Sequence, residues 1–65
     1  MRIIVNGDPH ETDAQTIESV LGELGLDRAV VATALNGEFV TKARRRDTPV
    51  AEGDRLDVLA PMQGG

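Results

Sequence analysis

The stretch that decides the fold is Glu52-Gly53-Asp54-Arg55-Leu56-Asp57-Val58-Leu59-Ala60-Pro61-Met62-Gln63-Gly64-Gly65. It begins with a turn sequence, and residues 55–60 then alternate between polar and apolar side chains, which predicts a strand with one buried face. Pro61 has no amide hydrogen to donate to a neighbouring strand, so we expect the strand to end before it. Residues 61–65 are then expected to lie beyond the sheet.

The first strand of the chain is the expected neighbour of this last strand. Ile3-Ile4-Val5 is a β-branched run, and the Asn6-Gly7 pair after it is a strong signal for a hairpin turn. A second, weaker strand is expected over residues 10–13. The first and last strands are then candidates for parallel neighbours at the centre of a sheet.

Residues 16–25 carry the pattern of a short amphipathic helix. Apolar side chains recur at spacings of three and four residues, which places them on one helix face: Ile17, Val20, Leu21 and Leu24. Thr16 can cap the first turn, and Glu18 suits the positive end of the helix dipole. Gly25 can end the helix in a left-handed conformation.

The second half of the chain predicts two more strands before the last one. Residues 29–35 are largely apolar on both faces, which is typical of a central strand. Asn36-Gly37 is a second turn signal, and residues 38–41 predict a short strand. Residues 42–51 are polar, and we expect an irregular connection there.

This element order predicts an α+β β-grasp (ubiquitin-like) roll, with a mixed sheet and one main helix packed on one face. We assign residues 1–60 to this domain and residues 61–65 to a flexible C-terminal tail. The side chains expected to face the helix are Ile3, Val5, Ile17, Val20, Leu21, Leu24, Val31, Leu35, Val40, Leu56 and Val58. The opposite sheet face would carry Ile4, Ala32, Ala34 and Leu59.

Composition narrows the function classes. The chain has 65 residues, no cysteine and a formal net charge of −4. A domain of this size has little room for a deep ligand pocket, which argues against a self-contained enzyme. The acidic balance argues against binding to nucleic acid or to anionic lipid. We find no apolar run long enough to span a bilayer and no signal-peptide pattern, so we expect a cytoplasmic protein.

The two glycines at the end of the chain suggest a working carboxylate. Glycine has no Cβ, so Gly64 and Gly65 would carry a free α-carboxylate on a very thin stem. Residues 61–65 could reach at most ~16–18 Å, enough to enter a channel in a partner protein. The alternative is a frayed end without function, as many chain termini are.

Several short motifs, taken in order, resemble those of one family: Asn6-Gly7, Thr16-Ile17, Asn36-Gly37-Glu38-Phe39-Val40, Glu52-Gly53-Asp54-Arg55-Leu56 and Pro61-Met62-Gln63-Gly64-Gly65. Together they resemble the ThiS/MoaD-like family of ubiquitin-fold proteins, and most closely its sulfur carriers of thiamine biosynthesis. The resemblance covers essentially the whole chain. Lys42-Ala43 and Thr33 depart from the family pattern, but neither belongs to the tail.

The resemblance implies a protein co-substrate without catalytic residues, bound cofactor or metal of its own. A ubiquitin-activating-enzyme-like adenylyltransferase would use ATP to adenylate Gly65. A persulfide sulfur donor would then convert Gly65 to a thiocarboxylate, and thiazole synthase would take the sulfur. Gly64 would fit the channel of the partner, with Met62 and Gln63 at its entrance. The sequence leaves open the identity of the donor and any service to other pathways.

Two related functions remain as alternatives. A ubiquitin-like modifier that is conjugated to lysines also needs an activated C-terminal glycine. The small subunit of molybdopterin synthase shares the fold and the diglycine, although Met62-Gln63 looks more like the thiamine branch. A plain adaptor domain is a third class, and the acidic charge and the diglycine both count against it.

Other residues are candidates for contacts. Ile4 and Leu59 on adjacent strands would form an apolar patch for a partner, and Phe39 belongs either to this patch or to the edge of the core. His10 lies among acidic residues, but a lone histidine is more often solvated than metal-bound. Ser19 has no partner for a nucleophilic role. Arg44-Arg45-Arg46 could hold a phosphate or an acidic partner, but a solvated loop is the preferred interpretation.

Overall fold

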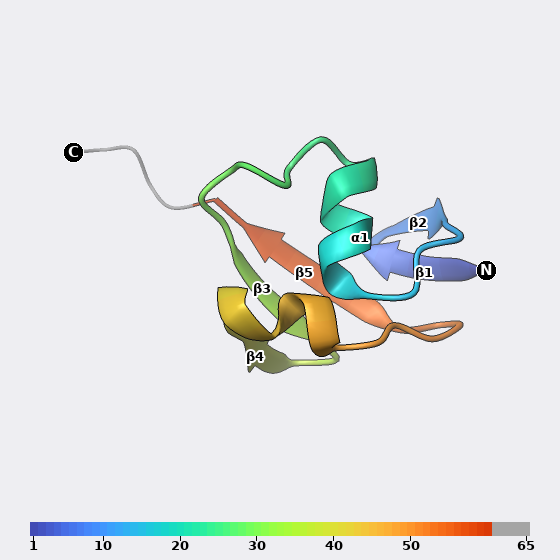
Figure 1. Cartoon of the computed structure of the whole chain (residues 1–65). Coiled ribbons are helices and arrows are strands. Elements are labelled where there is room, and N and C mark those ends of the chain that lie inside the picture. The colour runs from blue at the N-terminus through green and yellow to red at the C-terminus, as the bar shows by residue number, and fades with distance from the viewer. Residues whose placement is uncertain (61–65) are drawn as a thin grey trace.

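The computed structural model describes residues 1–60. These residues form one five-stranded mixed sheet with one α-helix and one 3-10 helix (Figure 1). In chain order the elements are β1 (Arg2–Val5), β2 (Asp8–Glu11), α1 (Ile17–Glu23), β3 (Ala32–Leu35), β4 (Glu38–Val40), η1 (Lys42–Asp47) and β5 (Arg55–Leu59). The strand order across the sheet is β2-β1-β5-β3-β4.

The pairing of β1 with β5 defines the fold. The two strands are parallel, with Ile4 opposite Arg55 and Val5 opposite Leu56. The remaining strand pairs are antiparallel. The sequence prediction of a parallel central pair is therefore confirmed, and β5 lies in the middle of the sheet.

Both Asn-Gly pairs form the hairpin turns that the sequence predicts. Asn6 and Gly7 have φ angles of 50° and 86°, and Asn36 and Gly37 have φ angles of 51° and 87°. Positive φ at both central residues is the geometry of a type I′ turn, whose twist matches that of the strands. Because the first turn contains only two residues, β2 begins at Asp8 rather than at the predicted residue 10.

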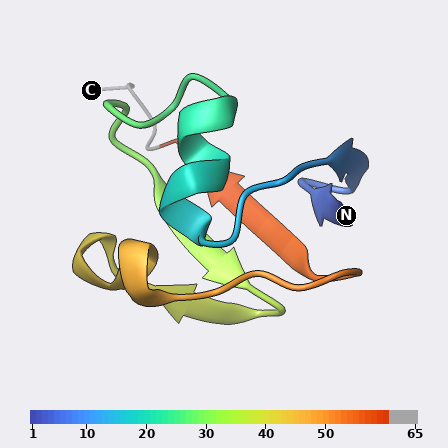
Figure 2. The same cartoon turned by 45° about the vertical axis from the view of Figure 1, so that its right-hand side comes forward.

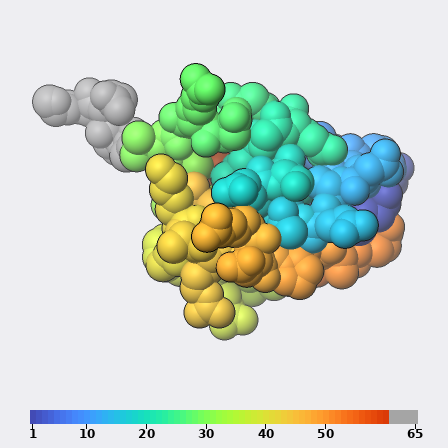
Figure 3. All heavy atoms as spheres, viewed as in Figure 1, coloured from blue at the N-terminus to red at the C-terminus, as the bar shows by residue number. Residues whose placement is uncertain are grey.

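The helix α1 begins and ends at the predicted signals. Thr16 accepts a hydrogen bond from the backbone N–H of Ser19 at 3.2 Å, and Gly25 follows the helix with a φ of 75°. Figures 1 and 2 show α1 lying across one face of the sheet. The 3-10 helix η1 packs beside α1 on that face, and Figure 3 shows the two surfaces in contact.

The core lies between the sheet and α1. Its most buried apolar residues are Ile3, Ala14, Ile17, Val20, Leu21, Val50, Leu56 and Val58. The half-buried residues packed against them are Val5, Leu24, Leu26, Val31, Leu35 and Val40. Every side chain that the sequence predicts to face the helix belongs to one of these two groups. The prediction missed Ala14, in the connection before α1, and Val50, in the connection after η1, both of which are buried in the core.

Two sequence predictions about the second half of the chain were wrong. The third strand begins at Ala32, not at residue 29. The Val31 carbonyl accepts a hydrogen bond from the Arg45 side chain, and Val30 is 78% exposed, so neither residue is part of β3. The segment predicted to be irregular contains η1, which begins at Lys42. Across residues 1–60, no helix is long and apolar enough to cross a membrane.

Candidate functional site

The candidate site begins where β5 ends. Leu59 is the last residue of β5 and lies opposite Ala32 of β3. The tail residues predicted to carry the chemistry, Met62, Gln63, Gly64 and Gly65, lie outside the described residues. The structure therefore defines the surroundings of the point at which the tail starts, at the end of the central strand (Figure 1).

An exposed apolar surface surrounds this point. Leu56 and Val58 face the core, so the alternation of β5 directs Leu59 to the uncovered sheet face, where it is 66% exposed. A shallow hollow beside the strand end is lined by Val30, Val31, Ala32, Leu59 and Ala60. Isolated exposed apolar residues are ordinary, but a connected group is typical of a contact surface.

Phe39 lies on the same uncovered face. It is opposite Ala34 in the β3–β4 pair and is 70% exposed, so it is not a core residue. The small side chains of Ala32 and Ala34 lie between Leu59 and Phe39 in the strand register. We call Leu59, Ala32, Ala34 and Phe39 the open-face patch.

Ile4 is on this face but at a different place. It is opposite Arg55, four residues before Leu59, which corresponds to roughly 13 Å along the strand. Ile4 is also half-buried, whereas Leu59 is exposed. The structure thus places Leu59 and Phe39 on the same sheet face, linked in the strand register by Ala32 and Ala34, and leaves Ile4 at the other end of the central strands.

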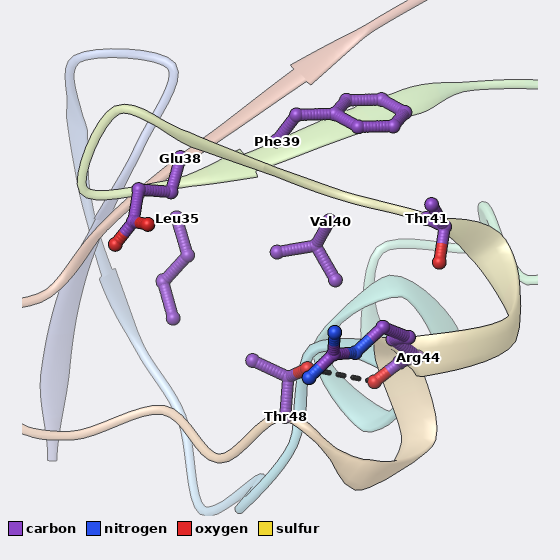
Figure 4. A pocket seen from close by; sticks show the side chains of 7 residues that line it. All are labelled: Leu35, Glu38, Phe39, Val40, Thr41, Arg44 and Thr48. Carbon is purple, nitrogen blue, oxygen red and sulfur yellow. Dashed lines mark hydrogen bonds between the residues drawn. The ribbon is translucent and has the colours of Figure 1, made fainter.

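A second hollow lies between β4 and η1 (Figure 4). Val40 and Leu35 line it from the strands, and Arg44, Thr41 and Thr48 line it from the side of η1. The Thr48 hydroxyl donates a hydrogen bond of 2.7 Å to the Arg44 carbonyl, which fixes the end of η1 at the rim of this hollow. The hollow is separate from the hollow at the end of β5.

The arginine run is divided between the interior and the surface. Arg44 and Arg46 are exposed, whereas Arg45 is only 7% exposed. Its Nε donates to the Thr33 hydroxyl at 3.1 Å, and its Nη2 donates to the Val31 carbonyl. The preference for a fully solvated loop was therefore wrong for Arg45. Thr33, one departure from the family pattern, is the residue that Arg45 contacts.

His10 belongs to a polar cluster between β2 and α1. Its Nε2 lies 3.3 Å from Glu23 Oε1, and the Thr12 hydroxyl donates to the same carboxylate. The hydrogen bond from Thr12, followed by that from His10, lowers the pKa of Glu23. Within residues 1–60, we find no group of three histidine or carboxylate side chains placed to hold a metal ion.

The side chain of Asn6 is a feature that sequence reasoning missed. It receives a hydrogen bond of 2.7 Å from the Val58 N–H and donates one of 3.1 Å to the Val58 carbonyl. The sequence identified Asn6 only as a turn residue. The signal that could have revealed the contact is the predicted parallel pairing, which places the end of the first strand beside the last one.

Comparisons with known proteins agree with this architecture. The model of the ThiS family matches residues 3–65. The sulfur carrier protein ThiS of Thermus thermophilus is 38% identical over 61 residues, which cover 94% of this chain and 95% of that protein. A thiazole synthase of Paramagnetospirillum magneticum is 38% identical over 66 residues, but the whole of this chain spans only 20% of that protein.

Solved structures show the same fold. The crystal structure of the thiamine biosynthesis protein ThiS from Geobacter metallireducens matches with a TM-score of 0.84 and 32% identity, and all of both chains is covered. A solution structure of a thiamine biosynthesis protein from that organism matches with a TM-score of 0.79 and 30% identity, covering 100% of this chain and 88% of that one. Because the family model, a full-length relative and these structures agree, the chain belongs to the ThiS family.

Proposed function

We propose that this protein is a sulfur carrier that delivers sulfur for thiazole formation in thiamine biosynthesis. The observation that carries the proposal is the match to a sulfur carrier protein ThiS over nearly the full length of both chains. The two glycines at residues 64 and 65 follow the end of β5 by a few residues, and a side-chain-free carboxylate stem suits this role.

The chemistry starts at the Gly65 carboxylate. A carboxylate is ionised at neutral pH and is a poor electrophile, so it needs activation. In the proposed first step, a carboxylate oxygen attacks the α-phosphorus of ATP on an adenylyltransferase, which yields an acyl-adenylate and releases pyrophosphate. The adenylate then provides a good leaving group at the Gly65 carbonyl.

Sulfur enters in a second step. The terminal sulfur of a donor persulfide attacks the activated carbonyl and displaces AMP, which gives an acyl disulfide. A second thiol of the donor then attacks the donor-side sulfur, so that the thiocarboxylate leaves with the electron pair and the donor becomes a disulfide. The carrier contributes no thiol to these steps, in agreement with its lack of cysteine.

The open-face patch is the proposed docking surface for the adenylyltransferase. It supplies apolar area on the exposed sheet face and begins at Leu59, next to the end of the sheet. A partner that covers this patch would also lie beside the end of β5, from which the chain continues to Gly65. Ile4, which the sequence placed in the patch, lies at the other end of the central strands and is not part of the proposed docking surface.

Thiazole synthase is the proposed acceptor of the sulfur. One relative that carries this name contains a segment matching the whole of this chain. A carrier-like segment within such a protein supports a working association between the two activities. It does not bear on the persulfide donor, which we define only by its chemistry.

Thiolation of the purified chain tests the proposal. The protein is incubated with ATP, the adenylyltransferase and a persulfide donor from the same cell, and its intact mass is measured. We expect the mass change of one oxygen replaced by sulfur. Deletion of Gly65 withdraws the carboxylate by ~3.3–3.6 Å. Because errors of ~1 Å can cost a reaction ~100-fold, the deleted form should gain almost no sulfur.

A second variant distinguishes the position of the carboxylate from the width of the stem that carries it. Gly64→Val keeps the carboxylate in place but adds a branched side chain to the stem, so thiolation should also fail. Both variants should melt like the parent, because the core of the described residues is formed by side chains between Ile3 and Val58. Equal thiolation of the parent and the deleted form would refute the proposal. Amide linkage to lysines without any thiocarboxylate would favour a protein modifier instead.

A further inference from the structure

Two asparagines hold β5 at its opposite ends. Asn6 exchanges hydrogen bonds with Val58, at 2.7 Å from the Val58 N–H and 3.1 Å to the Val58 carbonyl. Asn36 receives a hydrogen bond of 2.9 Å from the Arg55 N–H and donates one of 3.1 Å to Asp54 Oδ1. Each asparagine is the first residue of an Asn-Gly turn with positive φ.

The backbone pattern explains why Val58 needs a side-chain partner. The even-numbered residues at the start of β5 bond toward β1, since Ile4 N–H donates to the Asp54 carbonyl and Asn6 N–H to the Leu56 carbonyl. The odd-numbered residues bond toward β3, as the Asn36 N–H donates to the Arg55 carbonyl. The backbone N–H and carbonyl of Val58 therefore face the β1 side of β5. Because β1 ends at Val5, it does not extend far enough to pair with them.

The Asn6 amide replaces the missing strand at this position. A carboxamide offers one acceptor and N–H donors, as a peptide group does, so it can satisfy both the N–H and the carbonyl of one residue. Val58 is only 8% exposed, so water could not readily hydrogen-bond its backbone N–H and carbonyl if the Asn6 side chain were absent. As far as Val58, the residue before Leu59, β5 therefore has a partner on both sides. On one side the partner is β3, and at Val58 the partner on the other side is the Asn6 side chain.

We infer that Asn6 is a positioning residue for the tail. By holding Val58, it fixes the last residues of β5 and thereby the point and direction from which the tail is presented together with the open-face patch. This inference rests on the proposed function. Asn36 has no such role, because it holds the start of β5, at the far end from Leu59.

Asn6→Gly and Asn36→Gly form a matched pair of variants. Glycine accepts positive φ, and Gly-Gly is compatible with a type I′ turn, so both hairpins should remain. Each variant loses two side-chain hydrogen bonds around β5. The experiment measures amide exchange at Val58, thermal stability, and kcat and KM for adenylation by the adenylyltransferase. Asn6→Asp, which keeps the acceptor but loses the donor, is a second and milder variant.

We expect the two glycine variants to differ in function more than in stability. Asn6→Gly should expose the Val58 amide to exchange and lower kcat for adenylation on the order of tenfold, short of the ~100-fold that a full 1 Å misplacement can cost. KM should change little because the side chains of the open-face patch are unchanged and Leu59 remains paired with Ala32 of β3. Asn36→Gly should leave Val58 protected and kcat within about twofold of the parent, with Asn6→Asp between the two.

Other results would overturn the positioning role of Asn6. If both glycine variants lose activity in proportion to stability, or if Val58 stays protected in Asn6→Gly, Asn6 is only a structural residue. If Val58 is exposed in Asn6→Gly while kcat is unchanged, the hydrogen bonds are real but do not position the tail. If the parent itself is not adenylated, the proposed function fails and the positioning role with it, while the Val58 exchange still reports on the hydrogen bonds.

Discussion

At the scale of single residues, Arg45 carries a guanidinium into the interior of a small acidic protein. Among the described residues its side chain is held by the Thr33 hydroxyl and the Val31 carbonyl, and neither group is charged. Thr33 in turn donates to the Val40 carbonyl at 2.8 Å. The three elements β3, β4 and η1 are therefore joined by one chain of hydrogen bonds.

Replacement of Arg45 should destabilise the protein. In Arg45→Ala the Val31 carbonyl loses its side-chain donor, while the Thr33 hydroxyl keeps only its bond to Val40. A polar group left unpaired in the interior costs about 1–3 kcal/mol. Arg44→Ala and Arg46→Ala are matched controls at exposed positions and should stay within about 0.5 kcal/mol of the parent. Urea denaturation of the three variants is the measurement. Equal small effects at all three positions would contradict the interior role of Arg45.

Glu23 should make stability depend on acid pH. Its pKa is lowered by the Thr12 hydrogen bond and then by His10, so its ionised form is favoured in the folded state. A lowered folded pKa contributes stability that is present above the unfolded pKa of about 4.3 and is lost as the pH falls through the folded value. The excess stability of the parent over Glu23→Gln should therefore be present near pH 6 and disappear at lower pH. Melting both proteins across this range tests the expectation, which a constant difference would contradict.

At the scale of elements, α1 supplies the layer that covers the sheet. Leu21 is central in its buried stripe and is only 2% exposed. Leu21→Ala removes buried methyl groups and leaves a cavity, which should cost ~2–5 kcal/mol. Glu18→Ala on the exposed side is the control. A thermal melt of Leu21→Ala close to that of the parent would show that α1 does not pack as described.

The elements also show what the sequence could reveal. The two Asn-Gly turns, the α1 stripe and the alternation of β5 are local patterns, and each was predicted correctly because its cause lies within a few residues. The late start of β3 depends on Arg45, which lies far along the chain from Val31. The contact between Asn6 and Val58 likewise joins residues distant in sequence. Such long-range hydrogen bonds leave no periodic signal.

At the scale of the whole molecule, the proposed function uses one face of the sheet and one end of the chain. The helices α1 and η1 cover one side of the sheet (Figure 2). The open-face patch lies on the other side. The sequence correctly placed Leu59 on the uncovered face. It could not place Ile4 relative to Leu59, because the register between two parallel strands is set by the whole sheet.

Charge on the open-face patch should weaken docking without unfolding the protein. Leu59→Glu puts a carboxylate where the partner would bury apolar surface, and an unpaired buried charge is costly. Because Leu59 is 66% exposed in the free protein, the melt should change little. Ala51→Glu adds the same charge at an exposed position in the turn before β5 and is the control. Calorimetric binding to the adenylyltransferase should be weakened by the first variant alone, and unchanged binding of Leu59→Glu would remove the patch from the proposal.

The central claim is that Gly65 carries sulfur, and the most direct test is the intact mass of the protein isolated from its native cell. The account predicts the mass of a chain whose last residue is Gly65, together with a fraction of the protein in which one oxygen of the terminal carboxylate is replaced by sulfur. This fraction should be absent from cells that lack the adenylyltransferase. A protein found only with an unmodified carboxylate under thiamine-limited growth, or only in amide linkage to lysines of other proteins, would contradict the account.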